Sequence, residues 1–177
     1  FDIDDEKKAN RIKEEILEIP DENFKVLKVV KKERKRQPAK PFITSTLQQE
    51  ASRKLRFAPR RTMGIAQELY TGIDLGDGPI GLITYMRTDS TNLAQEAINE
   101  IREIIPGLYG NDSLPAEKRV YSNTSKNAQE AHEAIRPSSV TKKPEDVKKY
   151  LNNDQFELYS LIWKRSVASH MNDAILD

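Results

Sequence analysis

The chain begins with a helical pattern followed by a strand-like one. In residues 4–19 isoleucines recur at helical spacing and Pro20 ends the pattern, so an amphipathic helix is expected there. Apolar positions in residues 23–35 predict a strand whose lysines point outward or lie along an edge. The stretch 37–41, which contains two prolines, predicts a linker and a domain boundary.

Two short helices joined by a tight turn are predicted over residues 44–72. A hydroxyl side chain at one of positions 44–46 is expected to cap the first helix, and Gly72 to end the second. A turn-rich connection over residues 73–80 leads to a predicted strand over residues 82–86. Two helices around a tight turn are typical of a helix-turn-helix, and the strand that follows gives the order of a winged-helix unit.

The second half of the chain predicts more helices. Asn92 is expected to cap a long helix that Pro106 and Gly107 end, and residues 107–124 are expected to be irregular. Residues 127–136 predict a short helix or turn, and a further helix starts near Pro144. The last helix has core spacing at Phe156, Tyr159, Trp163 and Val167. The predicted fold class is α+β and mostly helical.

Charge is distributed unevenly although the net charge is only +1. Residues 25–40 hold eight Lys or Arg and one acid, residues 53–61 hold five and no acid, and residues 92–117 lean acidic. A basic first third predicts a face turned toward a polyanion, with Arg60 and Arg61 at the helical turn as candidate DNA contacts. Charge alone leaves open that these runs are only solvated faces.

Composition removes several classes of site. The absence of cysteine excludes disulfide scaffolds and thiolate metal sites, and it leaves the redox compartment undetermined. With His132 and His170 as the only histidines, no metal site is expected within this chain. No apolar run approaches the roughly 20 residues of a membrane span. No signal-peptide pattern is present either, which favours the cytoplasm. Because the chain starts at Phe1, we expect it to be a piece of something longer.

The stretch GLITYMRTDS, residues 81–90, holds the strongest candidate chemistry. On a strand, Tyr85 and Arg87 would share one face. A tyrosine hydroxyl, with a pKa of about 10, is a poor nucleophile unless its target is a phosphoryl group whose added charge is stabilised by cations. The guanidinium fork of Arg87 suits a phosphate. His132 and Arg136 are candidates for a second pair of donors.

Each of these residues also has a structural interpretation. A tyrosine on a strand is mostly a packing residue, an arginine two positions away is mostly a surface residue, and His132 between two glutamates is mostly a polar helix residue. The segment 72–78 fits neither phosphate-binding glycine motif, so nucleotide hydrolysis is not indicated. The residues by themselves leave catalysis and structure both open.

Four separated stretches make the chain resemble bacterial DNA topoisomerase I, of the type IA family. They are PFITSTLQQEASRKL, GLITYMRTDSTNL, NAQEAHEAIRPS and LYSLIWKRSVASHM, in the order of the family. With the lengths between them they cover roughly residues 41–171, whereas residues 1–40 resemble the family only in position and type. Topoisomerase III enzymes tend to carry proline at the position of Met86, so the wording TYMRTDS is similar to topoisomerase I.

The resemblance implies roles for named residues. Tyr85 would attack a phosphodiester of single-stranded DNA and become linked to the 5′ phosphate, with a 3′ hydroxyl as the leaving group. Resealing would need no ATP, and the linking number would change in steps of one. Arg87 would stabilise the scissile phosphate, and His132 would help to bind and position DNA. Arg136 would be a phosphate or structural partner, and Asp89 would hold a side chain of the site in place.

The resemblance also implies what the rest of the parent protein supplies. Type IA enzymes complete the cleavage site with a magnesium-binding toprim domain, which this chain lacks, so no cofactor is expected in this piece and it should be inactive alone. Residues 1–41 and 147–177 would belong to an arch-like, β-containing domain, and residues 42–146 to a winged-helix catalytic-tyrosine domain. The expected partners are single-stranded or negatively supercoiled DNA and the remainder of the parent chain. A cytoplasmic monomer is expected, with no membrane partner.

Rival functions make different demands on the sequence. A non-catalytic winged-helix DNA-binding module would not need Tyr85 at all. A tyrosine recombinase places its tyrosine after the histidine, whereas here Tyr85 precedes His132. A rolling-circle relaxase needs a histidine-rich metal site, and two histidines are too few. A purely structural helical domain is the remaining alternative.

Overall fold

The computed structural model describes residues 3, 5–20, 23–121 and 133–176. By its internal contacts the chain divides into a first unit that ends at residue 34 and a second unit of residues 35–176. The domain limits expected at 41 and 146 stay predictions. No helix within the described ranges combines the length and apolarity needed to cross a membrane.

The first unit contains the helix expected at the start of the chain. This helix, α1, runs from Glu6 to Leu17, and the Asp5 carboxylate caps it by accepting the Lys7 N–H at 2.8 Å. None of its residues is buried, and even Ile16, on the apolar face, is half exposed. The amphipathic pattern therefore forms a helix without a core to pack against within its own unit.

The prediction of a strand over residues 23–35 is wrong for most of that range. Residues 24–33 form no helix or strand, and Val26 and Leu27 are 82% and 96% exposed. Pairing begins only at β1 (Arg34–Arg36), which forms a two-stranded sheet with β4 (Ala174–Leu176). A strand-like pattern needs a partner strand, and residues 24–33 have none among the described residues.

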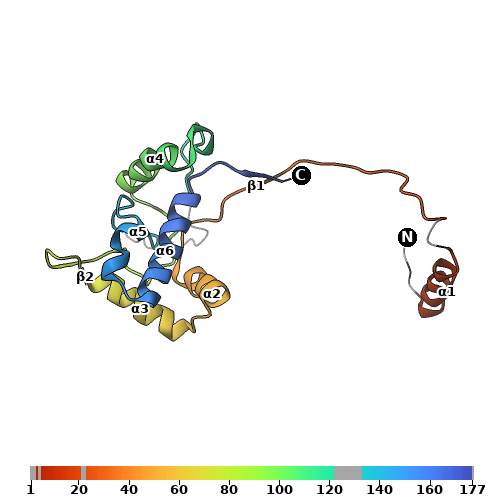
Figure 1. Ribbon diagram of the computed structural model, residues 1–177, viewed down its shortest axis with the longest axis horizontal. Coiled ribbons are helices and arrows are strands. Elements are labelled where there is room, and N and C mark those ends of the chain that lie inside the picture. The colour runs from red at the N-terminus through yellow and green to blue at the C-terminus, as the bar shows by residue number, and fades with distance from the viewer. Residues whose placement is uncertain (1–2, 4, 21–22, 122–132, 177) are drawn as a thin grey trace. The chain divides into compact units, whose positions relative to one another are not determined.

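The second unit is mostly helical, as expected, with two small sheets. Its helices pack around α6, which contacts α2, α3, α4 and α5 (Figure 1). The elements of this unit other than β1 and β4 are α2 (Thr44–Leu55), α3 (Pro59–Thr71), β2 (Ile73–Asp74), β3 (Pro79–Ile80), α4 (Gln95–Tyr109), the short 3-10 helix η2 (Asn111–Ser113), α5 (Pro144–Val147), a second 3-10 helix η3 (Lys148–Tyr150) and α6 (Asn153–Ala168).

The last helix, α6, supplies much of the core. Its buried aromatic residues also make hydrogen bonds: the Tyr159 hydroxyl donates to the Lys142 carbonyl at 2.6 Å, and the Trp163 indole N–H donates to the Val140 carbonyl at 2.9 Å. Two large side chains therefore fill apolar space and satisfy their polar atoms at once. Of the positions expected to face the core, only Phe156 is not fully buried.

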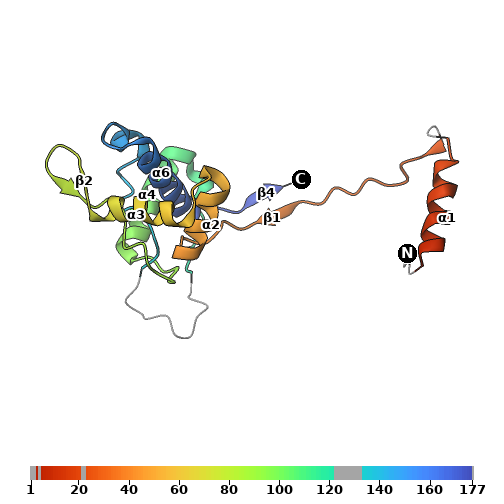
Figure 2. The ribbon, with the colours of Figure 1, turned by 90° about the horizontal axis from the view of Figure 1, so that it is seen from below.

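The turn between α2 and α3 is as tight as expected. Arg56 adopts the left-handed conformation with φ 59° at the end of α2, Phe57 is buried, and Pro59 opens α3. After α3 the chain forms the β2–β3 hairpin, in which Ile73 pairs with Ile80. Figure 2 shows this hairpin projecting beyond the end of α3.

Two expected elements are replaced by extended backbone. Residues 82–86 form no strand ladder, and only Ile83 makes an isolated antiparallel bridge, with Pro137. The short helix or turn expected over residues 127–136 lies partly outside the described residues. Residues 133–136 form no helix, and Ile135 is bridged to Phe42. Proline offers no N–H to a ladder, which limits how far this pairing can extend.

The predicted ends of helices α2 and α4 also need correction. Ile43 precedes the first helical residue of α2, so none of the hydroxyl residues 44–46 occupies the cap position. Helix α4 starts at Gln95 rather than after Asn92. Pro106 and Gly107 do not end α4, because the helix continues to Tyr109. A proline this close to the end of a helix removes one backbone hydrogen bond, and the burial of Ile101 and Ile105 keeps the last turns in place.

His170 is buried just after α6. Its Nδ1 lies 2.9 Å from the Ser169 hydroxyl and 3.2 Å from the Ser166 carbonyl, and its ring meets Tyr121 edge-on. Burial lowers the pKa of His170, the hydrogen bond with the Ser166 carbonyl opposes that shift, and the charges of Arg102 and Arg119 add to it.

The sign of the resulting pH dependence is determined by this lowered pKa. Below the ordinary histidine pKa of about 6.5, the unfolded chain binds a proton at this position that the folded chain resists. The free energy of unfolding should therefore fall as pH drops below about 6.5, by at most about 1.4 kcal/mol per pH unit for this group. Urea titrations between pH 5 and 8 should show a shallower fall in H170Q than in the unmodified chain. Identical slopes of the free energy of unfolding against pH would contradict the prediction. Any contribution of His132 is the same in H170Q and in the unmodified chain.

Candidate functional site

Within the segment 81–90, residues 85–90 alternate between exposed and buried side chains. Met86, Thr88 and Ser90 are buried, with exposed fractions of 1%, 8% and 0%. Between them, Tyr85 is 48% exposed and Arg87 and Asp89 also lie open. Residues 85–90 are therefore anchored by every second side chain, and they expose a phenol, a guanidinium and a carboxylate in between.

The first half of this segment is held by α3 and by residues 134–138. The Leu82 N–H donates to the Leu69 carbonyl at 2.7 Å. At Gly81 the backbone approaches α3 so closely that a Cβ would lie 2.7 Å from the Tyr70 carbonyl oxygen. The Thr84 N–H donates to the Arg136 carbonyl at 2.9 Å, and its hydroxyl donates to the Ala134 carbonyl at 2.7 Å.

The second half is held by one residue at the start of α2. The Thr44 hydroxyl lies 2.8 Å from the Met86 carbonyl oxygen and 3.1 Å from the Thr88 carbonyl oxygen, and it accepts the Thr88 N–H at 2.9 Å. The Thr44 N–H also donates to the Thr88 carbonyl at 2.9 Å. The backbone on both sides of Arg87 is thereby fixed to the first turn of α2.

A second tyrosine lies against Tyr85. The rings of Tyr70 and Tyr85 have centroids 5.3 Å apart at an interplanar angle of 63°, an edge-to-face contact. Tyr70 sits near the end of α3, the same turn that Gly81 and Leu82 approach. One face of the Tyr85 side chain is therefore supported by a neighbour while its other side remains exposed.

Glu133 connects this site to α4. Its carboxylate accepts the Ala94 N–H at the start of α4 at 2.7 Å and both Nε and a terminal nitrogen of Arg136, at 2.7 and 3.0 Å. Arg136 also donates to the carbonyls of Pro137 and Ser138. Its side chain is only 13% exposed, so the described structure uses this guanidinium to join two backbone segments.

The other predicted site residues differ in how free they are. Arg87, Asp89 and Arg60 make no hydrogen bond or ion pair with the residues that the structure describes. Arg61, by contrast, donates from Nε and a terminal nitrogen to Asp154 in the first turn of α6, at 3.0 and 2.6 Å, and covers the Phe57 ring. His132 lies outside the described residues.

Metal ligands do not gather in the described part of the chain. Within it, no group of three or more His, Cys, Asp or Glu side chains is close enough to hold an ion. The described residues therefore do not supply the ligand set of a magnesium site.

Comparisons with known proteins agree on one family. A family model described as DNA topoisomerase matches residues 1–177. The DNA topoisomerase 1 of Xylella fastidiosa (strain 9a5c) is 54% identical over 178 residues, which cover 100% of this chain and 22% of that protein. The DNA topoisomerase 1 of Helicobacter pylori (strain ATCC 700392 / 26695) is 50% identical over 173 residues, 98% of this chain and 23% of that protein. The chain belongs to the DNA topoisomerase family.

A solved structure extends the likeness to the fold. Full-length topoisomerase I from Thermotoga maritima matches with a TM-score of 0.70 at 46% identity, over 81% of this chain and 22% of that one. This topoisomerase chain thus spans less than a quarter of the length of the relatives it matches. The resemblance drawn from the four sequence stretches is confirmed at the level of the family.

Several residues that shape this candidate site were not singled out from the sequence. Thr44, Thr84 and Glu133 act on backbone atoms far away along the chain, and Tyr70 meets Tyr85 only after α3 has folded back. The available signal was the alternation of apolar or hydroxyl residues with polar ones over residues 85–90, which marks the inward positions.

The hydrogen bonds of the Thr44 hydroxyl with Met86 and Thr88 form a clamp on the backbone around Arg87. Replacing Thr44 by valine tests this clamp. Valine keeps the shape but removes the hydroxyl, so the buried Thr88 N–H and the Met86 carbonyl lose a partner. We expect the free energy of unfolding to fall by about 1–3 kcal/mol. For Thr44→Ser, which keeps the hydroxyl, the free energy of unfolding should fall by clearly less in the same urea titration. Equal values for Thr44→Val and the unmodified chain would show that the clamp adds no stability.

Proposed function

We propose that this chain is the tyrosine-bearing part of a type IA DNA topoisomerase, which relaxes negatively supercoiled DNA by transient cleavage of one strand. The observation that carries the proposal is the exposure of both Tyr85 and Arg87, two residues apart, on a segment anchored by its alternate residues. Membership of the DNA topoisomerase family supplies the reaction class.

Tyr85 is the proposed nucleophile. Its phenolic oxygen attacks the phosphorus of a phosphodiester in single-stranded DNA. A bond forms between that oxygen and the 5′ phosphate, the bond to the 3′ oxygen breaks, and the leaving 3′ oxygen takes up a proton as one leaves the phenol. The number of phosphoester bonds is unchanged, so the 3′ hydroxyl reverses the step without ATP after another strand has passed through the break.

Arg87 is proposed to stabilise the phosphate during transfer. Its guanidinium has no partner among the described residues, so it is available to a bound phosphate without first breaking an ion pair. The charge that develops on the phosphoryl oxygens in the transition state makes such a contact worth more there than in the ground state. The Thr44 clamp fixes the backbone that carries it.

The helices α2 and α3 and the β2–β3 hairpin are proposed to form a winged-helix-like grip on DNA. The turn between the helices brings together Arg53, Arg56 and Arg60, which can hold phosphates without reading sequence. Arg61 can join them only by releasing Asp154. Arg136 is proposed to act through its structural contacts, while His132 and Asp89 are proposed to position DNA or neighbouring side chains.

The remaining catalytic parts are proposed to lie elsewhere in a longer protein. Magnesium would be held by a toprim domain outside this chain. The chain alone would then bind DNA but not relax it, and the whole enzyme would work as a monomer in the cytoplasm.

The nucleophile can be tested in a chimera in which residues 1–177 replace the matching stretch of the Xylella fastidiosa relative. With magnesium and a labelled single-stranded oligonucleotide, a denaturing gel should show a covalent adduct that Tyr85→Phe abolishes. Tyr70→Phe is the matched control, because it removes a hydroxyl from the adjacent half-exposed tyrosine and leaves the ring contact. It should keep the adduct.

The same gel separates the rival function. An adduct that persists in Tyr85→Phe would assign the nucleophile to another residue. The absence of an adduct from a chimera that folds and binds DNA would favour a non-catalytic winged-helix module.

Arg87 gives a graded prediction. Arg87→Gln should slow single-turnover formation of the adduct by about a hundredfold or more, since a donor that acts on the transition state is lost. Arg87→Lys should recover part of the rate, because the charge remains while the planar fork is lost. Arg60→Gln is the control: it should weaken binding and leave the rate at saturating DNA unchanged. A rate for Arg87→Gln equal to that of the unmodified chimera would contradict the assignment.

A further inference from the structure

The outer face of α2 carries a groove lined mainly by residues with polar side-chain groups. It has a volume of about 360 Å³, and its lining comes from one stripe of the helix and the start of α3. The lining residues are Ser45, Gln48, Gln49, Ser52, Arg53 and Pro59. All but one of these offer a hydroxyl, amide or guanidinium group, so the groove presents both donors and acceptors.

The polar side chains of this groove have no partner of their own. None of the five makes a hydrogen bond or ion pair with the residues that the structure describes. Exposed amides elsewhere in the unit are paired along their helices, as Gln67 is with Thr71 and Gln95 is with Asn99. The groove therefore keeps its hydrogen-bonding capacity for something outside this part of the chain.

The groove also lacks carboxylates. The only acid of α2 is Glu50, which lies on another face of the helix, against Lys54 and Arg165 at 3.0 and 3.6 Å. The lining thus contains a cation, Arg53, and no anion. A polyanion meets attraction at Arg53 and no repulsion from the lining itself.

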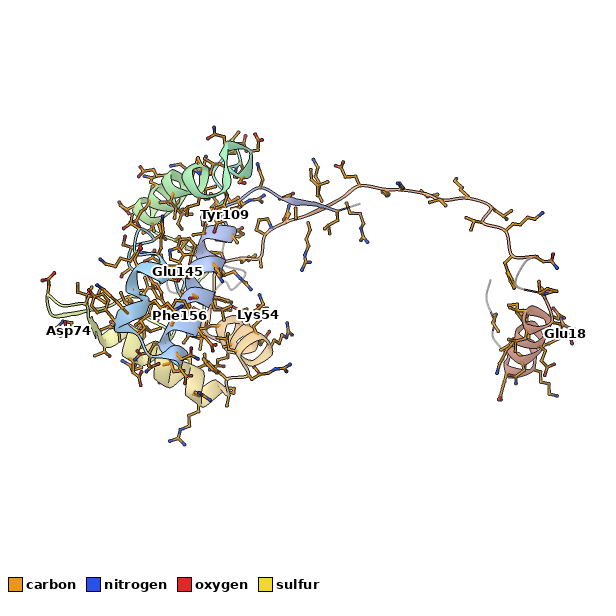
Figure 3. The ribbon with its side chains drawn as sticks, viewed as in Figure 1. Glu18, Lys54, Asp74, Tyr109, Glu145 and Phe156 are labelled. Atoms are coloured by element: carbon orange, nitrogen blue, oxygen red, sulfur yellow. The ribbon has the colours of Figure 1, made fainter. Side chains whose placement is uncertain are left out.

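Both ends of the groove reach features already described. At its start, Thr44 precedes the lining residue Ser45 and holds the backbone on either side of Arg87. At its end, the lining residues Arg53 and Pro59 flank the basic turn in the sequence. Lys54, labelled in Figure 3, follows Arg53 near the end of α2. A helix of 12 residues is about 18 Å long, the length of about five stacked nucleotides.

We infer that the groove on α2 is a path for single-stranded DNA between the Tyr85–Arg87 segment and the basic turn. The inference rests on the proposed function, and it adds a defined route along this unit for the strand beside the cleavage site. Arg53 holds a phosphate, and the glutamines and serines bond to whichever base edges or phosphate oxygens lie above them. Amide groups both donate and accept, so such a path accepts many sequences.

Affinity and its salt dependence test this path in the 177-residue chain. The probe is a fluorescein-labelled dT12 oligonucleotide, followed by anisotropy from low to moderate salt. Arg53→Gln removes one phosphate contact, so the slope of log K against log salt should lose about 0.7. The double variant Gln48→Ala, Gln49→Ala should weaken binding about fivefold or more at every salt concentration, with the slope unchanged.

Matched controls remove the same groups from other faces. Lys164→Gln takes one exposed cation from α6, and Gln67→Ala with Gln95→Ala takes two amides from α3 and α4. Neither control should change the slope or the affinity as much as its counterpart in the groove. All these positions are exposed or partly exposed, and urea titrations should confirm equal stability.

Three results would overturn the path. The first is that the groove variants bind dT12 like the unmodified chain. The second is that the control variants weaken binding as much as the groove variants do. The third is that the chain does not bind dT12 even at low salt. If the groove variants leave dT12 binding intact but weaken the binding of an acidic peptide, the first of these results would also point to a protein partner. The covalent adduct of Tyr85 is measured separately, so failure of the path leaves the proposed nucleophile standing, and the reverse also holds.

Discussion

The hydroxyl of Thr44 is the contact on which the presentation of the site depends. It lies where the first turn of α2 meets the segment 86–88, and it bonds to backbone atoms on both sides of Arg87. A short segment with no strand ladder has little regular hydrogen bonding of its own, so its shape comes from such point contacts. Thr84 does the same on the other side of Tyr85. Together they turn a loop-like stretch into a rigid support.

Charge pairing sorts the basic residues near this support into two groups. Arg61 and Arg136 are held by Asp154 and Glu133, and these pairs join α3 to α6 and the segment 133–138 to α4. Arg87 and Arg60 have no such partner in the described part of the chain. A count of positive charges along the sequence cannot make this distinction, because an ion pair depends on which acid the fold brings near.

The sequence predicted the elements whose pattern is local and missed those that depend on distant contacts. The spacing of Leu47, Ala51 and the apolar residues of α6 predicted helices that the structure contains. The start of α4 was misplaced because Glu133, far along the chain, receives the Ala94 N–H. For the site, the positions of Tyr85 and Arg87 could be predicted from alternation, whereas Thr44, Tyr70 and Glu133 are recognisable only once α2, α3 and residues 133–138 have come together.

Because buried and exposed residues alternate over residues 85–90, the positions that maintain stability and the positions that determine reactivity are neighbours in the sequence. Even-numbered residues are buried and maintain stability, and odd-numbered residues are exposed and contribute little to packing. Changes that alter reactivity can therefore accumulate at one set of positions with little risk of unfolding the chain. The same arrangement means that a chain with an inert residue at one of the odd-numbered positions would keep its shape. Loss of reactivity in such a chain would therefore leave no trace in its stability.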